Sequence, residues 1–164
     1  MDISKKRPLA RAWLGSAILS AIGLLSPLVF ADLEKGMTYY KAGQFTEALA
    51  EWTIDANGGD SVAQHSLGDL YERGEGVPQD AKKAVYWYTL SAEQGFSVAQ
   101  RNLGIMYLFG KGIEPNLELA YMWGNLAAAN GAEPDIRDLA AEELNSEQLA
   151  RAQKMSSDWA AAHP

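Results

Sequence analysis

Apolar residues recur through the middle of the chain at the spacing of amphipathic helices. Between residues 61 and 73, Ala63, Leu67, Leu70 and Tyr71 follow the periodicity of a helix, and most of the other positions are polar. Gly74 and Pro78 end this segment, because glycine permits a left-handed turn and proline cannot continue a helix. A second apolar stripe follows and ends at a Gln-Gly pair. The pattern therefore predicts a helix–turn–helix unit over residues 61–96.

This unit is repeated at a shift of 36 residues. Unrelated windows of this length would share roughly two or three identical residues by composition alone. From Ala63 to Gly95, twelve positions carry the same residue 36 positions later, and all but one are Ala, Gly, Leu or aromatic residues. We therefore predict two equivalent helix pairs, at 61–96 and 97–132. The repeated residues are Ala63, Gln64, Leu67, Gly68, Tyr71, Gly74, Gly76, Ala84, Trp87, Leu90, Ala92 and Gly95.

Variant units flank the two copies. Residues 32–60 carry a shorter version, in which the loop lacks five residues relative to the next unit. Beyond residue 132 the period fails, and we expect one helix from Pro134 to Leu144 and a last helix from a capping start at Asn145 to Ala160. A stacked array needs an atypical terminal unit to cover its core, so residues 133–164 are predicted to be capping helices.

The string A-x3-L-G-x2-Y-x2-G-x-G-V-x2-D-x3-A-x2-W-Y-x3-A-x2-G, from Ala63 to Gly95, resembles the Sel-one-like repeat, a branch of the tetratricopeptide-like α-solenoids. The next unit is similar, with Ile113 for the valine and Asn116 for the aspartate. The resemblance implies an all-α, right-handed α-solenoid that serves as a protein-interaction scaffold, often exported in bacteria. Some cysteine-rich members are linked to β-lactam binding; this chain has no cysteine, so nothing of that subgroup carries over.

The first 31 residues have the pattern of a secretory signal peptide. A basic head precedes an uncharged segment from residue 12 to residue 31, which ends in Val-Phe-Ala. We expect cleavage between Ala31 and Asp32, with Pro27 breaking the apolar helix and leaving an extended segment at the cut. The alternative is an uncleaved inner-membrane anchor, because 20 residues are enough to span a bilayer. In both cases the remaining chain is expected in the periplasm or outside the cell.

The charge narrows the range of partners. The net charge is -7 over 164 residues, and the first 31 residues carry +3, so the cleaved chain would carry -10. Nucleic acid is not expected as a ligand, because its binding needs clustered Lys and Arg. Anionic membrane surfaces would repel the cleaved chain. A protein or peptide is the expected partner.

No catalytic or cofactor-binding motif is found. His65 and Asp69 could share a helix face as metal ligands, but their repeat partners Arg101 and Ile105 could not ligate, so no metal is expected. The Gly-x-Gly pairs recur at the repeat period and follow no strand, which favours a structural role over phosphate binding. The chain is therefore not expected to be an enzyme. A cell-wall hydrolase or β-lactam-binding protein with an unrecognised site, and a structural subunit of an envelope complex, stay open as alternatives.

Outward-facing positions on the first helix of each pair are the candidate partner-binding residues. In a right-handed stack these helices line the concave side. The alternative is that these residues are only solvated, with the last two covered by the terminal cap. The candidates are Gln64, His65, Asp69, Glu72, Gln100, Arg101, Ile105 and Leu108.

Overall fold

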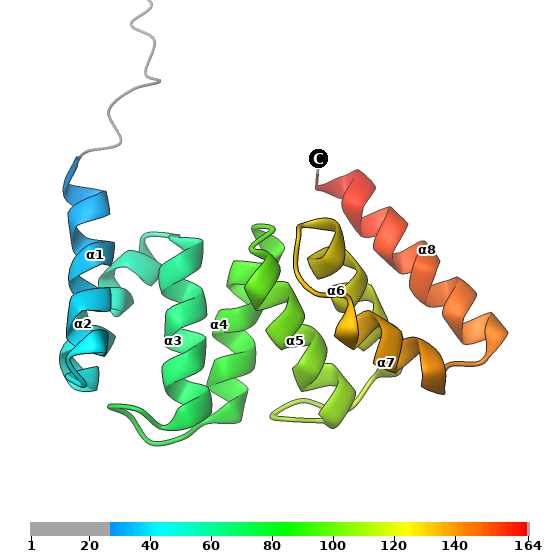
Figure 1. Ribbon diagram of the computed structural model, residues 1–164, viewed down its shortest axis with the longest axis horizontal. Coiled ribbons are helices and arrows are strands. Elements are labelled where there is room, and N and C mark those ends of the chain that lie inside the picture. Colours follow the sequence, from blue (N-terminus) through cyan, green and yellow to red (C-terminus); the bar gives the residue numbers. More distant parts are fainter. Residues whose placement is uncertain (1–26, 164) are drawn as a thin grey trace, which may run out of the picture.

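A computed structural model of the protein describes residues 27–163, with side chains from residue 34 onward. Eight helices form the described part of the chain, and it contains no strand. They are α1 (Pro27–Lys41), α2 (Phe45–Asn57), α3 (Ser61–Arg73), α4 (Ala81–Glu93), α5 (Ser97–Phe109), α6 (Leu117–Ala129), α7 (Asp135–Glu143) and α8 (Ser146–Ala162). They follow one another as a row of helix pairs (Figure 1). The all-α solenoid predicted from the sequence is confirmed.

Local side-chain chemistry sets the helix ends. Asp80 begins α4 by accepting hydrogen bonds from the N–H groups of Lys82 and Lys83, and Asn116 begins α6 in the same way. The predicted capping box at Asn145 is present in α8. Gly74 ends α3 in the left-handed conformation, as predicted, with φ at 74°.

The start of α1 differs from the prediction. Instead of breaking a helix before residue 31, Pro27 is the first residue of α1, and the helix continues through residues 31 and 32. Proline is tolerated there because the first turn of a helix needs no N–H from it. The predicted extended segment at the Ala31–Asp32 bond is therefore wrong for the uncut chain. The basic head and most of the predicted signal segment lie outside the described residues.

Small residues allow the helices of each pair to approach closely. A Cβ atom on Gly68 in α3 would lie 2.4 Å from the ring of Tyr88 in α4, and one on Gly36 in α1 would lie 2.3 Å from the Trp52 indole of α2. The Gly-x-Gly loops serve a related purpose. A Cβ on Gly112 would lie 2.4 Å from the backbone of Ala81, so this loop rests directly on the start of the preceding unit's second helix. This packing supports the structural interpretation of the Gly-x-Gly pairs.

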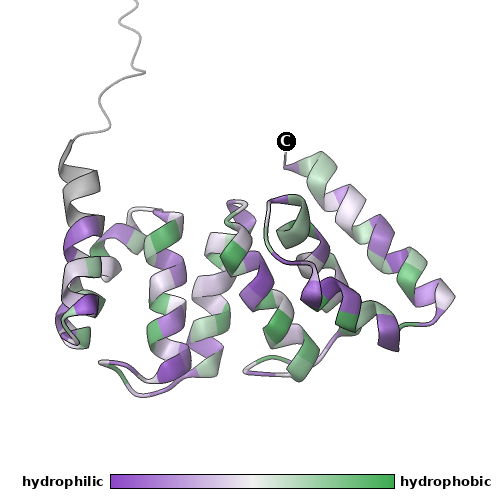
Figure 2. Cartoon of the chain, in the orientation of Figure 1, coloured by the Kyte–Doolittle hydropathy of each residue, from purple (hydrophilic) through white to green (hydrophobic). Residues whose placement is uncertain are grey.

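The core runs between successive pairs rather than through one centre. One cluster joins α2 and α3 around Trp52 and Leu67, and a second joins α4, α5 and α6 around Tyr88, Met106 and Trp123. Polar and apolar residues are interspersed along each helix (Figure 2). Within the described residues, no helix is both long and apolar enough to cross a membrane.

The two repeated tryptophans are not equivalent. Trp123 is 6% exposed and meets Trp159 of α8 edge to face, with 5.6 Å between the ring centroids, which places it in the core. Trp87 is only half-buried, and its outer side lies against the exposed ring of Tyr86. Trp87 therefore packs at the margin of the core, against the cluster around Trp52 and Leu67. In α4 the fully buried aromatic residue is Tyr88.

Candidate functional site

A groove lies between α1 and α3, the first helices of the first two pairs. It has a volume of about 350 Å³, and its floor is the buried Trp52 of α2. Part of its lining is apolar, and the rest includes the oppositely charged side chains of Asp69 and Arg73. We call it the α1–α3 groove. It is lined by Met37, Tyr40, Trp52, Val62, His65, Ser66, Asp69 and Arg73.

Two of the predicted surface residues are in the interior. Gln64 donates from Nε2 to the carbonyl of Ala56 at 3.1 Å, and its Oε1 accepts from Gln94 at 2.7 Å. Gln100 repeats this one unit later, donating to Ala92 and accepting from Asn130. Each glutamine thereby links its own pair to the pair before it. The prediction that Gln64 and Gln100 face outward is wrong, because hydrogen bonds to adjacent helix ends satisfy their amides inside the core.

His65 belongs partly to the core as well. Its ring packs against Tyr88 and Phe96, with centroid distances of 5.6 and 5.3 Å, and its Nε2 lies 3.2 Å from the Asn102 side-chain amide. His65 is therefore not the outward-facing, solvated residue that the sequence analysis predicts. Its Nε2 is 3.7 Å from Asp69, and the described residues contain no cluster of three or more metal-ligating side chains.

The position of His65 predicts a pH effect on stability. Burial lowers its pKa below the ordinary value, and the Asp69 carboxylate only partly opposes this; Arg73 lowers it and Glu72 raises it. The unfolded chain therefore binds the proton more readily, and stability must fall as the pH drops below about 6.5. Urea unfolding between pH 7.5 and pH 5 should show this decline in the wild type and a flatter profile in His65→Asn. Identical slopes would contradict the assignment.

The side chain of Tyr88 contacts both acidic residues of the predicted binding site. Its buried hydroxyl lies 2.6 Å from Asp69 Oδ1 and 2.8 Å from Glu72 Oε2. Burial raises the pKa of Tyr88, and the Asp69 carboxylate raises it further, so the hydroxyl keeps its proton. Asp69 and Glu72 are partly exposed, so their carboxylates reach the surface at or beside the α1–α3 groove. Their contacts with Tyr88 of α4 hold them in place.

Basic side chains balance these carboxylates. Arg73 lies 3.9 Å from Asp69 and donates a 3.0 Å hydrogen bond to the Tyr40 hydroxyl, which links α3 to α1. Lys111, from the loop after α5, lies 3.5 Å from Glu72. The face that runs along α1, α3 and the end of α5 therefore offers both charge signs beside an apolar groove. Such a mixed surface suits a peptide chain.

The remaining predicted residues lie toward the C-terminal cap. Arg101 forms a two-pronged ion pair with Asp135 of α7, and this hydrogen bonding lowers the pKa of Asp135. Leu108 packs against the cluster formed with α6, α7 and α8, as the alternative of cap coverage expected, and Ile105 is half-buried. Of the eight candidates, the structure brings only His65 and Asp69 to the α1–α3 groove, with Glu72 beside them.

Sequence reasoning missed the α1 contribution to the groove. Met37 and Tyr40 of α1 had no role in the predicted site, because the first unit was identified only by its repeat matches, and Arg73 at the end of α3 was not among the candidates either. The signal that could have found them is the shift of 36 residues itself, which places Trp52 at the position of Tyr88. An aromatic residue at that position faces the first helix of its pair.

Comparisons with known proteins agree with this architecture. The sequence pattern of the Sel1 repeat matches residues 61–96 and 97–131. The structure is similar to that of a protective antigen of uropathogenic Escherichia coli with an SLR fold, with a TM-score of 0.78 and 28% identity, covering 82% of this chain and 30% of the other. It is also similar to a Sel1 repeat protein from Oxalobacter formigenes, with a TM-score of 0.63 and 29% identity, covering 78% and 54%. No curated protein matches.

This chain spans less than two thirds of either of those two solved chains. What the match does establish is the repeat and the fold.

Proposed function

This chain is a Sel1-repeat protein, and we propose that it is an exported, non-catalytic scaffold of the bacterial envelope that binds a protein or peptide through the face lined by α1 and α3. Sel1 repeats usually mediate protein–protein interaction, and proteins built from them are generally non-catalytic. The observation that carries the proposal is the α1–α3 groove. It combines exposed apolar area with charged groups of both signs in one depression.

Met37 is the residue on which the test depends. It lines the groove from α1, and 38% of its surface is exposed although it is a large apolar residue. Single exposed apolar residues are common on protein surfaces, so the location of Met37 in the lining of the α1–α3 groove, and not its exposure alone, makes it the candidate contact. Its neighbours Tyr40 and Val62 are half-buried and provide the apolar surroundings.

We expect Met37→Glu to reduce partner capture from envelope extract at least tenfold without unfolding the protein. The physical reason is that a carboxylate would have to lose its water on binding. Ile54→Glu is the matched control, because Ile54 is 68% exposed on α2 and does not line the groove. Quantitative mass spectrometry of proteins captured by wild type and the two variants makes the measurement. Equal capture by wild type and Met37→Glu would refute groove binding.

Export is the second part of the proposal and rests on the sequence of residues 1–31. N-terminal sequencing of the protein recovered from the periplasmic fraction should begin at Asp32. A protein that begins at Met1 and stays in washed membranes would instead indicate an uncleaved anchor.

A further inference from the structure

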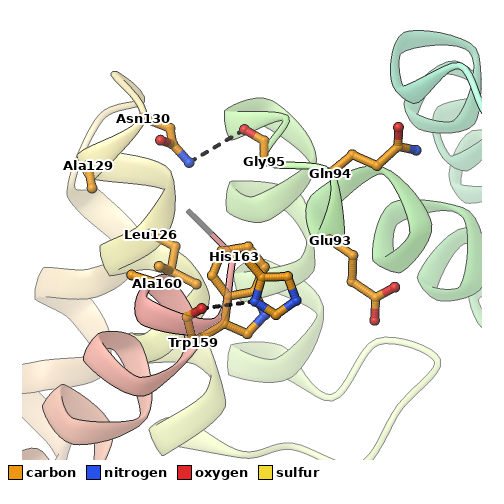
Figure 3. Close-up of a pocket in the computed structure, with 9 residues that line it drawn as sticks. All are labelled: Glu93, Gln94, Gly95, Leu126, Ala129, Asn130, Trp159, Ala160 and His163. Atoms are coloured by element: carbon orange, nitrogen blue, oxygen red, sulfur yellow. Dashed lines mark hydrogen bonds between the residues drawn. The ribbon is translucent and has the colours of Figure 1, made fainter.

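A second pocket lies at the opposite end of the array from the α1–α3 groove. It has a volume of about 450 Å³ and is formed where the C-terminal ends of α4, α6 and α8 meet. Figure 3 shows Glu93 from α4 across the opening from Trp159 and His163 of the α8 end, with Leu126 and Asn130 beside them. We call it the helix-end pocket.

The charged groups around the helix-end pocket are negative rather than positive. The C-terminal end of a helix carries a partial negative charge, and three such ends meet here. None of the three helices has a basic residue in its last turn, and no Lys or Arg lines the pocket. The side chain of Glu93 is exposed, and its carboxylate forms no ion pair or hydrogen bond with another side chain of the described residues. The last carbonyls of α4 and α6 accept hydrogen bonds from the N–H groups that follow them, but no Lys or Arg of the described residues lines the pocket to pair with Glu93.

One side of the helix-end pocket is formed by flat rings and apolar side chains. The rings of Trp159 and His163 stack with a centroid distance of 4.1 Å and an angle of 12° between them, and His163 Nδ1 lies 2.9 Å from the carbonyl of Trp159. Leu126 and Ala129 add apolar surface from α6. An exposed aromatic ring backed by a second ring is a surface on which a flat cation stacks.

We propose that the helix-end pocket binds an arginine side chain of a protein partner. A guanidinium group is planar and always charged, it stacks on aromatic rings, and it pairs with a carboxylate through two hydrogen bonds. The pocket supplies the ring of His163, the carboxylate of Glu93 and the negative helix ends, while Leu126 and Ala129 suit the aliphatic stem. This site is separate from the α1–α3 groove and does not depend on it.

The test uses the full chain with ¹⁵N-labelled tryptophan, and N-acetyl-arginine amide is the probe. Trp159→Phe identifies the indole signal of Trp159. We expect a saturable shift of that signal with the arginine probe, and at least tenfold weaker binding of N-acetyl-citrulline amide, which has the same shape without the charge. Glu93→Gln should weaken binding of the arginine probe at least threefold. Glu142→Gln is the matched control, because Glu142 is exposed on α7 outside the pocket and the same charge is lost.

Three results would overturn the proposal. Equal binding of the arginine and citrulline probes would show that charge plays no part. An unchanged affinity in Glu93→Gln would place the cation elsewhere. Stronger binding of N-acetyl-leucine amide would make the pocket an apolar docking site instead. None of these outcomes bears on the α1–α3 groove, so failure here leaves the proposed function intact.

Discussion

Trp123→Ala should lower the free energy of unfolding by about 3–5 kcal/mol, which is the range for removing a large aromatic side chain from a core. The indole is 6% exposed, belongs to the cluster that joins α4, α5 and α6, and contacts Trp159 of α8. The lost stability combines the buried apolar area of the indole with the cost of the cavity that its removal leaves. For a domain with roughly 5–15 kcal/mol in total, this is a large share.

Urea unfolding followed by circular dichroism measures this effect. Tyr86→Ala is the control, because Tyr86 is 57% exposed on α4 and its removal should change stability by less than about 1 kcal/mol. If Trp123→Ala unfolded at the same urea concentration as wild type, the core assignment would be refuted, and an aromatic ligand site would become the better interpretation.

Gly68→Ala should destabilise the protein by about 2–3 kcal/mol, although alanine is the better helix former. The new methyl group would lie 2.4 Å from the Tyr88 ring, which is fully buried and cannot move without losing its hydrogen bonds to Asp69 and Glu72. The clash therefore acts on the contact between α3 and α4, and through Tyr88 on the acidic residues beside the groove.

A double-mutant cycle isolates this contact. In a Tyr88→Ala background the ring is absent, so adding Gly68→Ala should cost less than about 0.5 kcal/mol, because substitutions without a packing conflict have small effects. Additive effects of the two substitutions would show that the Gly68–Tyr88 contact is not the cause. Stability of both single variants and of the double variant is measured by the same unfolding assay.

The features that were predictable from sequence are those fixed by neighbours along the chain. Asp80 and Asn116 cap helices because their side chains reach N–H groups two or three residues away, and Gly74 ends α3 by its own backbone conformation. The shift of 36 residues revealed the repeated pairs because identical packing requires identical small and large residues. These signals need no knowledge of which helices meet in space.

The surface residues were harder to predict, because exposure depends on contacts between units. Gln64 is polar and falls off the apolar stripe, yet it is buried because the ends of α2 and α4 bring a carbonyl and an amide to it. Arg101 is held by Asp135, which is 34 residues away on a helix outside the repeat pattern. The periodicity of a single helix does not reveal contacts with other units. The predicted site therefore included two interior residues, Gln64 and Gln100, and omitted Met37.

The most direct test of partner binding through the α1–α3 groove is site-specific photo-crosslinking in living cells. A photoreactive amino acid is placed at position 37, inside the groove, and in parallel at position 54, an exposed site on α2. We predict a discrete cross-linked protein of defined mass from position 37 and none from position 54. The same cross-linked species from both positions, or none from position 37 while position 54 cross-links, would contradict the groove as the binding site.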